Sequence, residues 1–178
     1  MRHFKTQKEA LDAYEMVREF CGVPFEQWLY GNKTESKEIN CSEEASDYLH
    51  DKCYIPKDRE HFWVILLDTN HNTMCDPIVV SEGLLDCVTV GAREVFSCAI
   101  WWQAAAIIVA HNHPSEDIEP SKKDIRLTKD LYEAGKLLHI PVLDHVIVSR
   151  KSAGFYSIRE KSDIWGSGNT EAREAAQE

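Results

Sequence analysis

The sequence predicts an α/β domain in which β-strands alternate with amphipathic helices. Short apolar runs such as residues 61–67 and 104–110 are typical of buried strands. Other segments, such as 121–138, place apolar residues every three to four positions along one helical face. Strands that alternate with helices build a sheet layered with helices. At 178 residues, the chain is long enough for one such domain and short extensions.

The individual elements follow from these periods and from the turn residues between them. The polar residues 68–72 predict the turn of a hairpin whose first strand is buried on both faces. Ser42 is the expected N-cap of a helix, because Glu43 and Glu44 follow it. We expect helices over residues 5–21, 42–52, 93–102 and 121–138, and strands over 61–67, 78–80, 88–90, 104–110, 141–148 and 155–158.

Changes in composition divide the chain into three parts. Residues 31–40 are polar, with alternating charges, and are typical of a linker. From about Gly166 the chain is rich in Gly, Ser, Ala and Glu, which is typical of disorder. We expect an N-terminal helical extension with its linker over 1–40, a main domain over 41–162 and a disordered tail over 163–178.

Charge and hydropathy restrict the classes of function. The net charge of −10 argues against a broad nucleic-acid surface, because phosphate binding needs clustered Lys and Arg. Lys122, Lys123, Arg126 and Lys129 do lie close together, and a solvated helix face is the preferred interpretation. No apolar run approaches the ~20 residues that cross a bilayer, and the N-terminus lacks a signal-type apolar stretch. We therefore expect a cytoplasmic protein without membrane association.

The six cysteines do not form a recognisable disulfide or zinc-knuckle pattern. None belongs to a Cys-x-x-Cys pair, and several lie in strand-like runs. Free, partly buried thiols in a reducing compartment are the expectation. Histidine and carboxylate side chains are therefore the metal ligands to look for.

Two histidines, His111 and His113, follow the apolar run 104–110. Residues i and i+2 of an extended chain point to the same side, so both imidazoles are expected to face one point at a sheet end, where α/β proteins place their sites. Asp124, in the first turn of the next predicted helix, reaches them if the intervening loop folds back. Two imidazoles and one carboxylate leave a fourth tetrahedral position for water, as in catalytic zinc sites.

Each fragment of this pattern also has an ordinary structural interpretation. A single histidine at a strand end is usually a surface or packed residue. Ser121-x-x-Asp124 alone is typical of a helix capping box, although the two oxygens of Asp124 allow capping and metal binding together. The whole string places four functional residues at fixed spacing within fourteen positions. It is therefore more specific than any of its parts.

The string His111-x-His113-x7-Ser121-x-x-Asp124 resembles the JAMM motif of the JAB/MPN metalloprotease superfamily. The longer sequence around it, HNHPS…PSKKDIRLTKDLYEAGKLLHIPVLDHVIV, is similar to the RadC-like branch. The match covers about residues 42 to 160. The resemblance implies a deaminase-like α/β sandwich with a mixed sheet flanked by helices. It also implies one zinc ion per chain held by His111, His113 and Asp124, with Ser121 helping to hold the oxyanion and an upstream glutamate transferring the proton.

The superfamily places this glutamate just before an early apolar strand. Glu60 directly precedes the run 61–67 and is preferred, with Glu82 as the rival and a solvated strand start as the ordinary interpretation of Glu60. Asp144 and His145 are candidates to support the ligands, because a metal-bound histidine usually donates its second N–H. An ordinary pleated strand with alternating faces is the more common explanation of that pair.

Three features depart from the branch. Glu116 stands where glycine commonly follows HNHPS, and Gly91-Ala92 stands where His-Pro is common. The N-terminal segment also lacks the paired glycines of the helix-hairpin-helix domain that longer members carry. Glu116, Asp117 and Glu119 are interpreted as a solvated acidic loop, with one of them an alternative ligand. These departures concern substrate and partners more than metal binding.

The expected function is that of a zinc-dependent metallohydrolase, a metallopeptidase or isopeptidase acting on a protein or peptide substrate. The alternative is a RadC-type accessory protein of DNA repair or of mobile elements, with proteins of those systems as partners. Direct nucleic-acid binding is not expected. The letters His-Asn-His do not indicate a nuclease, because nucleases named for them spread these residues over tens of positions. The intact ligand set argues against a metal-free scaffold.

Overall fold

The computed structural model describes residues 36–83, 90–150 and 154–166. Its elements are, in chain order, α3 (Ser42–Lys52), β1 (Glu60–Leu67), β2 (Ile78–Gly83), α4 (Ala92–Trp102), β3 (Ala106–Asn112), α5 (Lys122–Leu138), β4 (Val142–Val148), β5 (Phe155–Ser157) and α6 (Ile158–Lys161). The predicted helix over 5–21 and most of the predicted strand over 88–90 lie outside the described residues.

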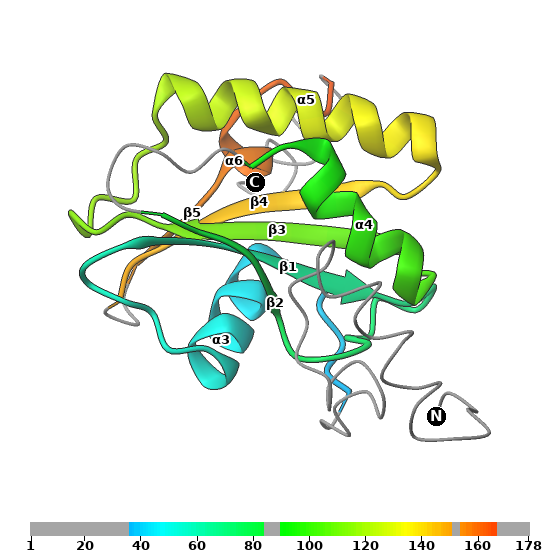
Figure 1. Cartoon of the computed structure of the whole chain (residues 1–178), viewed down its shortest axis with the longest axis horizontal. Coiled ribbons are helices and arrows are strands. Elements are labelled where there is room, and N and C mark those ends of the chain that lie inside the picture. The colour runs from blue at the N-terminus through cyan, green and yellow to red at the C-terminus, as the bar shows by residue number, and fades with distance from the viewer. Residues whose placement is uncertain (1–35, 84–89, 151–153, 167–178) are drawn as a thin grey trace, which may run out of the picture.

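In this part of the chain, five strands form one mixed sheet in the order β2-β1-β3-β4-β5. β1 pairs antiparallel with β2 and with β3, β3 pairs parallel with β4, and β5 pairs antiparallel with β4. The parallel pair needs a long crossover, and α5 supplies it. Figure 1 shows α4 and α5 over one face of the sheet and α3 over the other. The predicted α/β sheet flanked by helices is confirmed, and so is the β1–β2 hairpin.

Each face of the sheet carries its own apolar cluster. On β1, Phe62, Val64 and Leu66 pack under α4 and α5. Trp63 and Ile65 point the other way and pack against α3. Because successive strand residues alternate between faces and both faces are covered, β1 reads as an unbroken apolar run. The predicted burial of this strand on both faces is thereby confirmed.

The start of α3 differs from the sequence-based expectation. Cys41, not Ser42, is the N-cap residue, and it offers no side-chain hydrogen bond to the helix. The Ser42 hydroxyl donates instead to the carboxylate of Glu160, which belongs to α6 and lies 118 residues further along the chain. The N-cap prediction was wrong by one residue because this distant acceptor is not visible in a local pattern. α6 was not predicted, since its four residues are too short to show a helical period.

Of the predicted disordered tail, only residues 163–166 are described. Within them, the Trp165 indole donates to the Val142 carbonyl at 2.8 Å, and its ring lies 5.5 Å from that of Tyr132. The packed part of the described chain thus continues to Trp165. Among the helices of the described ranges, none combines the length and apolarity that crossing a membrane requires.

Candidate metal centre

The two histidines of the motif converge at the end of β3. This strand runs two residues further than predicted, so His111 lies inside it, opposite Phe62 of β1. Its ring is 1% exposed and stacks on the Phe62 ring with 6.0 Å between centroids and an interplanar angle of 6°. His113 projects to the same side, and the Nε2 atoms of His111 and His113 are 2.9 Å apart. The convergence of the two imidazoles, which the two-residue period of a strand predicts, is confirmed.

Asp124 reaches this pair from the first turn of α5. Ser121 is the N-cap, and its Oγ accepts hydrogen bonds from the backbone N–H groups of Lys123 and Asp124 at 3.2 and 3.3 Å. In return, the Ser121 N–H donates to Asp124 Oδ2 at 2.6 Å. Asp124 Oδ1 lies 3.6 Å from His111 Nε2, and Oδ2 lies 3.5 Å from His113 Nε2. Asp124 therefore caps the helix and faces both histidines, as its two oxygens allow.

These three side chains form a group that could hold a metal ion. One ligand atom from each of His111, His113 and Asp124 lies within 4.8 Å of the others. Two neutral imidazoles and a carboxylate suit zinc and several other divalent transition metals. The acidic loop contributes no carboxylate to this group within the described residues.

A buried chain of hydrogen bonds runs from His111 back to α5. His111 Nδ1 lies 2.8 Å from His145 Nε2, and His145 Nδ1 lies 2.6 Å from Thr128 Oγ1. The Thr128 hydroxyl donates to the carbonyl of Asp124 at 2.6 Å. Thr128 must therefore accept from His145 Nδ1–H, which leaves His145 Nε2 to accept from His111 Nδ1–H. The lone pair of His111 Nε2 is thus directed at the candidate centre.

His113 is oriented by the loop between β3 and α5. Its Nδ1 donates to the carbonyl of Asp117 at 2.6 Å, so the lone pair of the neutral ring lies on Nε2, and in the protonated ring Nε2–H donates to Asp124. Glu116 adopts a left-handed backbone conformation, with φ of 63°. Glycine enters this conformation without a steric penalty, which explains why glycine suits this place in the RadC-like pattern. The Glu116 carboxylate instead accepts from Arg150 Nε at 3.3 Å.

The pKa values of His111, His113 and Asp124 differ, and their shifts bear on how readily each side chain could bind a metal ion. Burial lowers the pKa of His111 to about 4, so its imidazole is neutral near pH 7. A hydrogen bond with Asp124 raises the pKa of His113. Burial acts to raise the pKa of Asp124, but the hydrogen bond with His113 and attraction to His111 in its protonated form outweigh burial and hold the pKa of Asp124 below its usual range. Asp124 is therefore ionised and ready to act as a ligand.

The two candidate glutamates lie on opposite faces of the sheet. Glu60, the first residue of β1, is two positions before Phe62 and thus shares the face of His111. Burial raises the pKa of Glu60, with smaller electrostatic contributions from His113 and Asp124. Glu82 is paired in register with His61 and is exposed, with an oxygen 3.8 Å from His61 Nε2. The structure thus brings Glu60 toward the candidate centre and does not bring Glu82 there.

Asn112 was not singled out from the sequence, yet it positions Glu60. It lies between the two histidines, and its side chain is buried. Its amide donates to the carbonyls of Pro56 and Arg59 at 3.0 and 3.1 Å, and its Oδ1 accepts from the His61 N–H at 2.8 Å. These bonds hold the backbone on both sides of Glu60. The only indication of this role in the sequence was an amide side chain between two histidines at the end of a buried strand.

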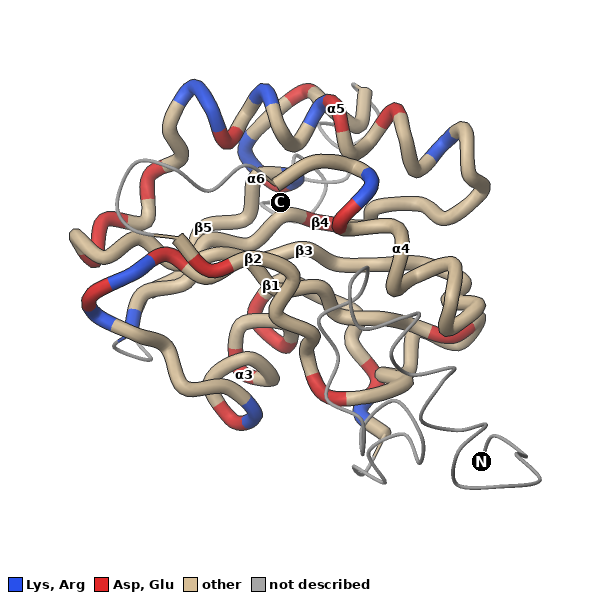
Figure 2. The backbone as a smooth tube through the Cα atoms, viewed as in Figure 1, with Lys and Arg blue, Asp and Glu red and all other residues tan. Residues whose placement is uncertain are grey.

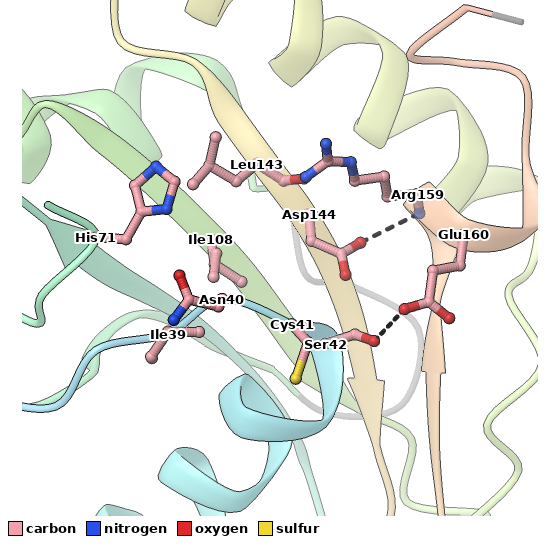
Figure 3. Close-up of a pocket in the computed structure, with 10 residues that line it drawn as sticks. All are labelled: Ile39, Asn40, Cys41, Ser42, His71, Ile108, Leu143, Asp144, Arg159 and Glu160. Carbon is pink, nitrogen blue, oxygen red and sulfur yellow. Dashed lines mark hydrogen bonds between the residues drawn. The ribbon is translucent and has the colours of Figure 1, made fainter. Parts of the chain in front are cut away.

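Asp144 and His145 point to opposite faces of the sheet and have different partners. His145 contacts His111, whereas Asp144 points to the opposite face of the sheet. There Asp144 accepts from the Arg159 N–H at 3.1 Å and from the Ser157 hydroxyl at 2.8 Å. Figure 3 shows Asp144 facing Arg159 inside a cavity of about 340 Å³ on that face. Of the two, only His145 supports the candidate ligands.

Comparisons with known proteins point to one family. The sequence profile of the RadC-like JAB domain matches residues 39–163. A UPF0758 protein of Alkaliphilus metalliredigens is 48% identical over 104 residues, which make up 58% of this chain and 44% of that protein. A UPF0758 protein of a Picosynechococcus species is 35% identical over 146 residues, or 82% of this chain and 59% of that protein.

The chain spans about half the length of the curated relatives that it matches. The family match nevertheless covers most of the chain and includes Glu60, both histidines of the motif, Ser121 and Asp124. The resemblance seen in the motif is thereby confirmed: the chain belongs to the RadC-like JAB domain family.

Proposed function

We propose that this protein is a zinc-dependent hydrolase of peptide or isopeptide bonds. The observation that carries the proposal is the convergence of His111, His113 and Asp124 on one point, with Glu60 on the same face of the sheet but outside the ligand group. Three protein ligands are typical of catalytic zinc sites, whereas structural sites usually use four. A separate carboxylate nearby is what general acid–base chemistry requires.

The spacing of the donor atoms is compatible with zinc. Ligand atoms about 2.0–2.1 Å from zinc in a tetrahedral arrangement are roughly 3.3 Å apart. The distance between His111 Nε2 and His113 Nε2 is 2.9 Å, and the two histidine–Asp124 distances are 3.6 and 3.5 Å. The Nε2–Nε2 distance lies within a few tenths of an ångström of the tetrahedral value, and each histidine faces a different oxygen of Asp124. The hydrogen-bonded Nδ1 atoms of both histidines leave Nε2 free to bind the ion.

Zinc held by these residues would polarise the substrate carbonyl and would lower the pKa of a bound water to about 7. Glu60 would accept a proton from the attacking water and would deliver it to the leaving amine. Burial raises the pKa of Glu60 toward pH 7. A group whose pKa lies closer to the working pH can both take up and release a proton. The Ser121 hydroxyl accepts two backbone N–H groups and donates its own proton to the Asp124 carboxylate, from which the proton would turn to a developing oxyanion.

Metal analysis combined with a hydrolysis assay tests this proposal. We expect about one zinc ion per chain, and we expect zinc-dependent cleavage of quenched fluorescent peptides that contain either an α-peptide or a lysine isopeptide bond. His113→Ala should lose both the metal and the activity. His139→Ala is the matched control, because His139 lies at the far end of α5, outside the ligand group. A folded wild-type protein that takes up no zinc would refute the proposal.

The pH dependence of zinc binding follows from the ligand pKa values. The raised pKa of His113 means that a proton competes with zinc there, whereas His111, with a pKa of about 4, and ionised Asp124 carry none. We expect the affinity to fall about tenfold for each pH unit below the pKa of His113, which corresponds to one displaced proton. Chelator competition between about pH 5 and 6 measures this slope. A slope of two protons in that range would show that His111 also titrates.

A further inference from the structure

A cavity of about 370 Å³ lies on the outer face of α5, next to the candidate centre. Three of its lining residues are the cations Lys122, Arg126 and Lys129, which we call the α5 stripe. They stand at positions i, i+4 and i+7, so they line one side of the helix, and all three are exposed. Figure 2 shows several basic stretches along the N-terminal half of α5, with acidic positions between them.

The α5 stripe takes no part in the ion pairs of the described residues. None of its three cations forms an ion pair with an acidic residue of the described ranges, whereas Lys136 on the same helix pairs with Glu133 at 3.3 Å. Like charges three to four positions apart on a helix repel one another. Asp130 and Glu133 stand four positions after Arg126 and Lys129, but they form no ion pair with them, and Glu133 pairs with Lys136 instead. The unneutralised charge is complementary to an anionic partner.

The stripe lies within reach of a substrate bound at the candidate centre. Ser121 lines the cavity, and its backbone N–H donates to the Asp124 carboxylate. Thr128, which faces His145, marks the opposite, buried side of the helix. A helix is about 10–12 Å across, and an extended peptide advances about 3.3 Å per residue. Three or four peptide residues therefore lead from the centre around the start of α5 to the stripe.

We propose that the α5 stripe is a docking surface for acidic peptide segments. An acidic side chain roughly three or four residues from the attacked bond binds Lys122, Arg126 or Lys129. Ile125 and Pro120 add an apolar wall to the cavity, which suits an aliphatic residue between the acids. As a site for substrate, the surface rests on the proposed hydrolase function. Its binding of acidic peptides does not depend on hydrolysis.

A protein partner fits these residues better than duplex DNA does. Nucleic-acid affinity comes mainly from neutralising many phosphates along an extended basic surface. The stripe offers three cations on two turns of one helix, and the exposed Asp130 and Glu133 follow on the next turns. A duplex lying along α5 would meet these carboxylates. A short peptide would occupy the cavity alone.

Fluorescence anisotropy on the full-length chain as purified, with its zinc content recorded, tests the docking surface. The probe is a fluorescein-labelled peptide containing Glu-Leu-Glu-Asp, and its neutral counterpart contains Gln-Leu-Gln-Asn. We expect the double variant Arg126→Gln with Lys129→Gln to weaken binding of the acidic peptide by roughly 10-fold. Lys136→Gln, the matched control on the same helix, should bind as the wild type does. Raising the salt from about 0.05 to about 0.3 M should also weaken binding.

Three results would overturn the docking surface. One is equal binding of the acidic and neutral peptides, and another is an equal loss in the double variant and in Lys136→Gln. The third is a labelled DNA duplex that binds more tightly than the acidic peptide and loses its affinity in the double variant. Zinc-dependent turnover without charge-dependent binding would refute the docking surface alone. Charge-dependent binding by a chain that holds no zinc would refute the hydrolase function and support the docking surface.

Discussion

Replacing Glu60 by glutamine is expected to lower kcat/KM for peptide hydrolysis by roughly 10²–10⁴-fold, the range that a general acid–base group contributes. Glutamine preserves the size of the side chain but can neither accept nor release the proton. Because Glu60 is not a member of the His111, His113 and Asp124 group, zinc content should stay unchanged. Turnover of the quenched peptides and zinc per chain, measured on the same preparations, check both parts of this expectation.

Glu82→Gln is the matched control for this variant. The chemical change is identical, but Glu82 is exposed and is paired with His61, on the face of the sheet away from the candidate ligands. It should therefore keep full activity and full zinc content. Full turnover in Glu60→Gln would contradict the assignment of Glu60. An equal loss of activity in both variants would show that disturbing this end of the β1–β2 pair causes the loss, and that proton transfer by Glu60 does not.

The ligand group could be predicted because each half of it follows a local rule. His111 and His113 share a side through the two-residue period of a strand, and Ser121 and Asp124 share the first turn of a helix. Bringing the halves together needed the loop between β3 and α5 to fold back, and spacing alone did not determine that. The resemblance to the JAMM motif implied it, and the hydrogen bond from His113 to the Asp117 carbonyl shows how the loop is held.

His145 was one of two candidates for supporting the ligands, but Thr128 and Asn112 could not be predicted, because their contacts join distant parts of the chain. The bonds from Thr128 to His145, from His145 to His111 and from Asn112 to Pro56 span 17, 34 and 56 residues. No periodic pattern carries information over such separations. The same reason explains why the local pattern predicts Ser42 as an N-cap, although its hydroxyl donates to Glu160 of α6.

The separation of Asp144 from His145 has a more specific cause. Val142 packs on the face under α4 and α5, so strict alternation would place Asp144 on that face and His145 on the other. The register between β3 and β4 shifts after Ile107, and one extra residue of β4 is accommodated there. Such a bulge reverses the faces of all residues that follow it. It therefore turns His145 toward His111.

Thr128→Val is expected to weaken zinc binding by roughly 10- to 100-fold, the usual effect of losing a partner that orients a metal-bound histidine. Valine matches threonine in shape but cannot accept from His145 Nδ1–H. His145 can then keep its lone pair on Nδ1 and donate from Nε2 to His111 Nδ1. That reversal moves the His111 proton to Nε2, the atom that would bind the metal. A proton on that atom competes directly with zinc.

Thr128→Ser separates this effect from a loss of packing at a fully buried position. Serine retains the hydroxyl that accepts from His145 and donates to the Asp124 carbonyl, but it lacks the methyl group. We therefore expect Thr128→Ser to bind zinc nearly as the wild type does, even if its melting temperature falls. Competition with a chromogenic chelator, alongside circular dichroism of each variant, gives both readouts. Equal zinc affinities for the valine and serine variants would contradict the proposed control of the His111 tautomer, because only one of them can complete the hydrogen-bond chain from His111 through His145 to α5.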